Sequence, residues 1–181
     1  MNSTEQKLAE IIEYQKQLVD IGNYNYYQSA IDNFFYPAEI LNVEVKSQLQ
    51  ILRVEFTEDY KTNPPFVKAS ISRYSDRLAE ILDYYVGTGK FHGRLYPHLG
   101  KKQIKNSIEV IVTLESIKNK LVDIVVDADE SDIEELCKSF DKVDKLISEN
   151  ISLSKSFIKD ISKKMTAINI RLDRDLTNSK Q

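Results

Sequence analysis

The chain has 181 residues, of which 41% are hydrophobic and 29% are charged, and its formal net charge is −3. This balance excludes a disordered tail, and the apolar runs are only a few residues long where a membrane span needs about 20. The polar N-terminal sequence shows no signal-peptide pattern, and Cys137 is the single cysteine, so the sequence predicts a cytoplasmic protein.

The first two predicted helices meet at Pro37. The spacing of apolar residues predicts a helix that begins near Ser3, where Ser3 and Gln6 have the spacing of a capping box. We expect it to end at Pro37, because the residue before a proline avoids the α region. A second helix then runs to about Lys61. The wide apolar surface of this helix predicts a central position in the fold. Its main stripe contains Leu41, Val45, Leu49, Leu52 and Phe56, and the residues that widen it are Ile40, Val43, Ile51 and Val54.

Three more helices follow the Asn63-Pro64-Pro65 break. The third is expected at about 66–85, and the fourth at about 103–128. The capping-box spacing of Ser131 and Glu134 predicts the start of a fifth helix that runs to about Leu176. The expected core positions of the fourth helix are Ile104, Ile108, Ile111, Leu114, Ile117, Leu121 and Ile124. In the fifth helix Asn150 and Ser154 fall at positions of the repeat where apolar residues are expected. They either set the register of helix packing or mark a break of this helix into two.

These elements predict an all-α fold, an elongated up-and-down bundle of about five long helices. The near-heptad rhythm of the C-terminal helix predicts that it projects as a coiled coil and pairs with another chain. We expect one domain over residues 1–177 and a frayed tail over 178–181.

Residues 86–102 differ from the rest of the chain. They hold four of the five glycines and both histidines, and no acid lies between Asp83 and Glu109. Lysines at the start of a helix oppose its dipole, and a bound anion would relieve this. The candidate anion- or nucleic-acid-binding residues are Lys90, His92, Arg94, His98, Lys101, Lys102 and Lys105. Alternatively, the fourth helix starts at Asn106, and these lysines lie in a solvated loop.

A histidine and an arginine lie close together in this segment, and such a pair can catalyse RNA cleavage. Arg94-Leu95-Tyr96-Pro97-His98 resembles the Arg…His motif of the all-helical HEPN ribonucleases. The resemblance covers these five residues and the helical class, and it implies metal-independent RNA cleavage by Arg94 and His98. The spacing departs from the family, which has four to six residues between Arg and His where this chain has three. Pro97 also falls where the family has helix.

The sequence contains no complete catalytic motif, and we predict no cofactor and no metal site. The net charge alternates along the chain, at −5 for residues 1–62, +5 for 63–122, −7 for 123–150 and +4 for 151–181. Long helices and charge blocks favour a non-enzymatic adaptor or regulatory protein that binds a protein partner or itself, mainly through its C-terminal helix. The alternative is an RNA-, DNA- or phosphate-binding protein, in one version a ribonuclease, that uses residues 87–105.

Overall fold

The computed structural model describes residues 2–87, 100–124 and 129–179, and these are helical almost throughout. The elements in chain order are α1 (Ser3–Ala30), the π-helix η1 (Ile31–Phe35), α2 (Tyr36–Thr62), α3 (Pro64–Ala69), α4 (Ile71–Gly87), α6 (Lys101–Asp123) and α7 (Glu130–Ser179). The predicted all-α class is confirmed. Within the described ranges, no helix is long and apolar enough to span a membrane.

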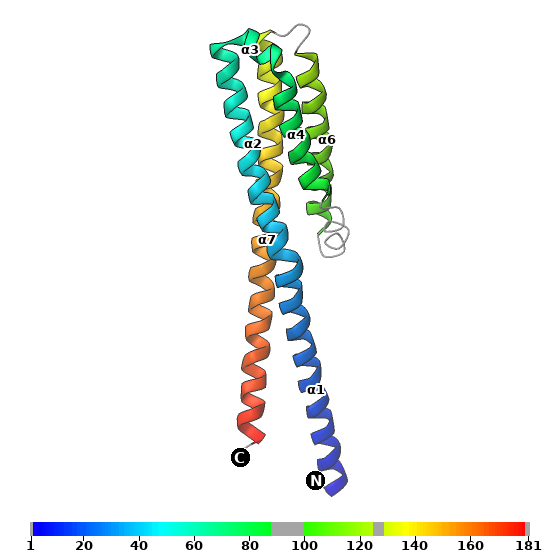
Figure 1. Ribbon diagram of the computed structural model, residues 1–181. Helices are drawn as coiled ribbons and strands as arrows, with labels where there is room; N and C mark the ends of the chain where they lie inside the picture. Colours follow the sequence, from blue (N-terminus) through cyan, green and yellow to red (C-terminus); the bar gives the residue numbers. More distant parts are fainter. Residues whose placement is uncertain (1, 88–99, 125–128, 180–181) are drawn as a thin grey trace.

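The molecule is elongated and has two parts (Figure 1). The first, the four-helix part, consists of α2, α4, α6 and the N-terminal half of α7 lying side by side. The second, the stalk, consists of α1 and the C-terminal half of α7, which extend together from one end of the four-helix part. Both ends of the chain lie at the free end of the stalk, so α1 and α7 run antiparallel there.

A single continuous helix contains α1, η1 and α2, so the predicted helix end at Pro37 is wrong. Proline lacks an N–H, and its ring clashes with the carbonyl four residues back in a regular α-helix. Here one π-turn precedes the proline, with the Tyr36 N–H bonded to the carbonyl of Ile31, and Pro37 falls in the first turn of α2. The wider turn accommodates the proline without ending the helix.

The core of the four-helix part contains one stripe from each of its helices. Most residues expected there are buried, among them Leu41, Val45, Leu49, Leu52 and Phe56 of α2, Leu114, Ile117 and Leu121 of α6, and Ile124 at the C-cap of α6. Two expectations are wrong. Ile108 is exposed rather than buried, and α2 is not central, because Ile40, Val43, Ile51 and Val54 are also exposed. In this chain α2 packs against its neighbours on one side only.

The long C-terminal helix is unbroken from Glu130 to Ser179, so Asn150 and Ser154 do not interrupt it. In the stalk its apolar seam packs against α1 and η1 of the same chain rather than standing free for another chain. The buried residues of this second cluster are Ala30, Ile31, Phe35 and Met165, with Tyr24, Tyr27, Phe34, Ile158 and Ile161 against them. Coiled-coil geometry in this region stays a prediction.

The capping boxes lie close to their predicted positions but use other residues. Asn2 and Glu5 cap α1, in place of Ser3 and Gln6. Asp129 and Asp132 exchange hydrogen bonds at the start of α7, in place of Ser131 and Glu134. Asparagine and aspartate accept backbone N–H groups as well as serine does, and the negative charges suit the helix dipole.

Candidate functional site

The predicted basic site is only partly within the described residues. Lys90, His92, Arg94 and His98 lie outside them, so the proposed roles of those four residues stay predictions. The other three lysines occupy the first turns of α6, which begins at Lys101. The alternative helix start at Asn106 is therefore wrong, and Asn106 itself is buried. Lysines do stand at this helix N-terminus, as the sequence predicted.

One of these lysines has a partner in its own chain. Lys102 Nζ lies 2.5 Å from Glu149 Oε1 of α7. The hydrogen bond and the charge of Lys102 hold the pKa of Glu149 below its usual value. A carboxylate of the same chain therefore compensates the charge of Lys102. Lys101 and Lys105 have exposed side chains.

Beneath these lysines lies a buried polar network that joins α6 to α7. Gln103 Nε2 donates to Ser154 Oγ at 2.9 Å and to the Asn150 carbonyl at 3.3 Å. Asn106 Nδ2 donates to Asn150 Oδ1 at 3.1 Å, and Asn150 Nδ2 donates to Ser107 Oγ at 3.2 Å. Since these groups satisfy one another, the network fixes the register of two helices and offers no free group to a ligand.

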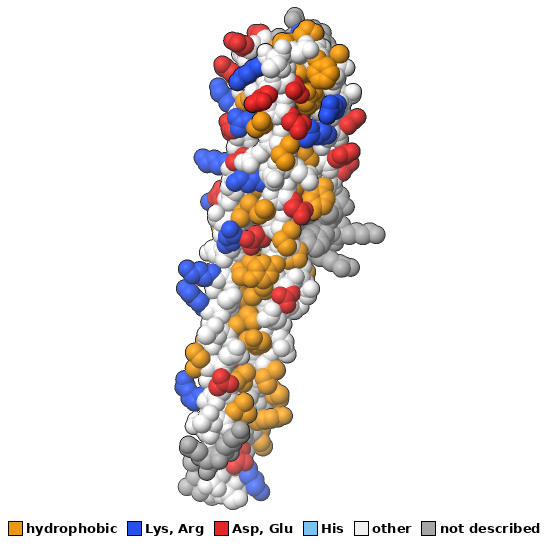
Figure 2. Space-filling view, turned by 60° about the vertical axis from the view of Figure 1, so that its left-hand side comes forward, with side chains coloured by type: hydrophobic (Ala, Val, Ile, Leu, Met, Phe, Trp, Pro, Cys, Tyr) orange, Lys and Arg blue, Asp and Glu red, His pale blue; other side chains and the backbone are white. Residues whose placement is uncertain are grey.

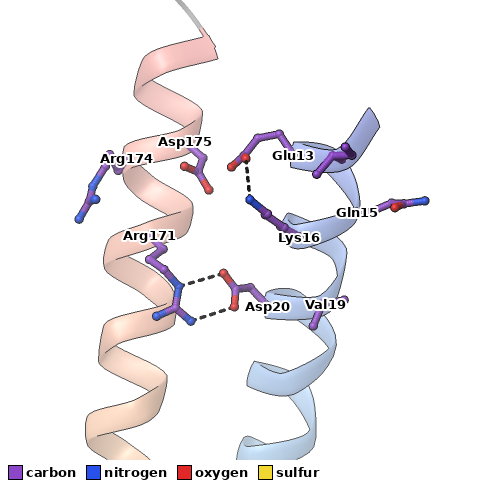
Figure 3. Close-up of a pocket in the computed structure, with 9 residues that line it drawn as sticks. Glu13, Gln15, Lys16, Val19, Asp20, Arg171, Arg174 and Asp175 are labelled. Carbon is purple, nitrogen blue, oxygen red and sulfur yellow. Dashed lines mark hydrogen bonds and ion pairs between the residues drawn. The ribbon is translucent and has the colours of Figure 1, made fainter. Parts of the chain in front are cut away.

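A groove of about 510 Å³ runs between the two stalk helices (Figure 3). Arg171 donates from Nε and Nη2 to both carboxylate oxygens of Asp20, at 3.1 and 2.8 Å. Within α1, Lys16 and Glu13 form a longer pair at 3.9 Å. This arrangement clamps α1 to α7 across the groove.

A second groove, of about 620 Å³, lies between α2 and the start of α7. Its wall includes Cys137, whose Sγ lies 4.0 Å from Thr57 Oγ1. On its rim Arg53 pairs with Asp141. Among the described residues no cluster of three or more His, Cys, Asp or Glu side chains could hold a metal ion. In the second groove the hydrogen-bond contact of Cys137 is to the hydroxyl of Thr57 rather than to a base.

The exposed large hydrophobic side chains are concentrated on the outside of α1 and α2. More than half of the exposed large hydrophobic side chains among the described residues occur on this one helix, each 44–61% exposed. We call these thirteen residues the outer face: Leu8, Ile11, Ile12, Tyr14, Leu18, Val19, Ile21, Tyr26, Tyr36, Ile40, Val43, Ile51 and Val54. Figure 2 shows hydrophobic side chains in a band that continues from the four-helix part down the stalk.

Most of the outer face lies opposite the side of the helix that packs into the chain, and Ile12 and Val19 at its edge also line the groove between α1 and α7. Residues two positions apart in an α-helix lie about 200° apart around its axis. Val43 is exposed and Val45 is fully buried, and Leu18 is exposed next to the Asp20 that binds α7. From Tyr24 onward the long helix is thus apolar on two opposite sides, and only one of them is covered, whereas the first part of α1 faces α7 with polar residues such as Lys16 and Asp20. The sequence showed the second stripe, but we assigned its α2 part to the core of this chain.

Comparisons with known proteins add no relative. No family model, no curated protein and no solved structure matches this chain.

Proposed function

We propose that this chain is a non-enzymatic interaction protein whose binding surface is the outer face of α1 and α2. The observation that carries the proposal is the second apolar side of the long helix. A helix that is hydrophobic on all sides is normally buried between layers, and large exposed apolar patches mark interaction sites. One layer is the rest of this chain, and the partner supplies the other.

The charges beside the outer face favour a protein partner over an anionic surface. Residues 1–62 carry a net charge of −5, which opposes nucleic acid and anionic lipid. Several of the acids already have partners in the chain: Asp20 with Arg171, Glu39 with Lys155, and Glu55 with Arg77. Binding through this face is therefore driven by apolar burial and should persist at high salt.

Each of two test positions on the outer face has a control position elsewhere in the chain with the same exposed fraction. Ile11 on the outer face and Ile170 on α7 are both 55% exposed, and Ile51 on α2 and Ile108 on α6 are both 51% exposed. Glutamate at any of the four sits in a helix at a half-exposed position, so the cost to folding is similar in each pair.

The experiment is capture of proteins from the lysate of the source cells by the tagged full-length chain, at high salt. We expect a discrete protein that is retained by the parent chain and by Ile170→Glu and Ile108→Glu. Ile11→Glu and Ile51→Glu should lose it. A captured protein that all four variants retain equally would contradict the proposal, and so would a chain that captures no protein, an untagged copy of itself included.

The nucleic-acid alternative rests on the basic segment 87–105. In its described part, Lys101 and Lys105 are exposed at the start of α6, while Lys102 pairs with Glu149. Nucleic acid that co-purifies at low salt and dissociates at high salt would favour this alternative, because phosphate binding falls steeply with salt.

A further inference from the structure

We infer that the partner of the outer face is a second copy of this chain, so that two long helices pack along one another in a dimer. The inference rests on the proposed function and names the occupant of the same surface.

The first argument is shape. The outer face extends from Leu8 to Val54 along one continuous helix, which at 1.5 Å per residue is roughly 70 Å. A compact domain would cover only part of such a surface. A long helix with a matching apolar stripe covers all of it, and this chain has one in the same helix. A two-fold axis brings the same patch of two copies together.

The second argument is area. The thirteen side chains of the outer face are about half exposed, which leaves on the order of 1,000 Å² of mainly apolar surface per copy. A standard stable interface takes about 800 Å² from each partner, and homodimers commonly bury more. The outer face is therefore large enough to support a dimer without a contribution from any other surface.

The third argument is charge. Helical periodicity places Gln15 and Gly22 among the apolar side chains of the α1 part and Ser47 among those of the α2 part, with single charged residues at Lys7 and Glu44. An antiparallel pair of identical faces places neither charge against its own copy, because Lys7 and Glu44 lie toward opposite ends of the face. A different partner would not need a face with so few charges, because it could supply complementary charges of its own.

The test is the mass of the purified full-length chain in sedimentation velocity, between about 1 and 100 µM, where a micromolar Kd is resolved. We expect a species of twice 20.9 kDa, at low and at high salt. Ile11→Glu and Ile51→Glu should each weaken self-association by at least about 100-fold, because a symmetric dimer carries each substitution twice. Ile170→Glu and Ile108→Glu should leave it within about threefold.

Far-UV circular dichroism of each variant checks that it is folded, and mixed donor- and acceptor-labelled chains give a second measure of association. A chain that stays monomeric throughout this range overturns the inference. A dimer that all four substitutions leave intact, or that all four dissociate, overturns it as well. A monomer that still captures another protein through the outer face would refute only the dimer, whereas a monomer that captures nothing would refute the proposed function too.

Discussion

Alanine at Asn150 tests whether the buried polar network between α6 and α7 is a cooperative unit. Asn150 is 2% exposed and accepts a hydrogen bond from Asn106. In Asn150→Ala one N–H of Asn106 loses its acceptor, which costs about 1–3 kcal/mol, and the lost packing adds about 1 kcal/mol. Ser154→Ala costs less, about 0.5–1.5 kcal/mol, because Gln103 keeps the Asn150 carbonyl as an acceptor.

Urea unfolding followed by circular dichroism, at one fixed protein concentration, measures both free energies of unfolding. We expect Asn150→Ala to be the more destabilising by about 1–2 kcal/mol. Leucine at both Asn106 and Asn150 should recover most of the loss, since the main polar partners are then removed together. Equal costs for the two alanine variants, or a double leucine variant worse than Asn150→Ala, would refute the network argument.

Three further predictions concern α2, the stalk and the basic segment. Asn42 is buried and its Oδ1 has no partner among the described residues, so Asn42→Leu should raise the free energy of unfolding in urea by about 1 kcal/mol; a lower value would contradict this. Arg171 holds the pKa of Asp20 below its usual 3.8, so the pair stabilises above about pH 4 and its contribution is lost as the pH falls through the lowered pKa; thermal melts should show this acid loss in the parent chain and a smaller one in Asp20→Asn. If the nucleic-acid alternative holds, Lys101→Glu with Lys105→Glu should weaken RNA binding in filter assays and reduce the salt slope by about 2; an unchanged slope would exclude those lysines as contacts.

The sequence was sufficient to predict the helical class because the helical spacing of apolar residues and the positions of helix-breaking residues agree over long segments. Apolar residues at helical spacing located the core of α6, and Asn63-Pro64-Pro65 correctly separated α2 from the next helices. The proline rule failed at Pro37. A proline removes one hydrogen bond and crowds one carbonyl, and a single π-turn absorbs both effects when the flanking helices are held by packing on either side.

The candidate site was harder to predict because an apolar stripe in a sequence does not show whether the same chain or a partner covers it. Ile40 and Val43 show the same spacing as buried residues, yet they are exposed in this chain. The sequence-level inference of a central α2 assumed that one chain supplies all the neighbours of the helix. Likewise the partner of Lys102 is Glu149, 47 residues away in sequence, and no local pattern reveals such a pairing.

Substitutions at Gly22 can separate the stability of the stalk from the association of two chains. It lies on the outer face, four residues after Leu18 and four before Tyr26, and a Cβ added there meets nothing within 4 Å. In a helix interior glycine is less favourable than alanine by about 0.8–1 kcal/mol, and arginine is nearly as good as alanine. Gly22→Ala should therefore stabilise the stalk.

Gly22→Arg should also raise the thermal stability of the single chain, measured at a concentration below the dimer Kd. At the same time it places a long charged side chain in the middle of the apolar contact, so sedimentation should show weaker self-association. A substitution that destabilises the fold usually weakens binding as well. Gly22→Arg should instead raise the stability of the single chain and weaken its self-association. An arginine variant that is both more stable and fully dimeric would show that the second copy does not bind at this part of α1.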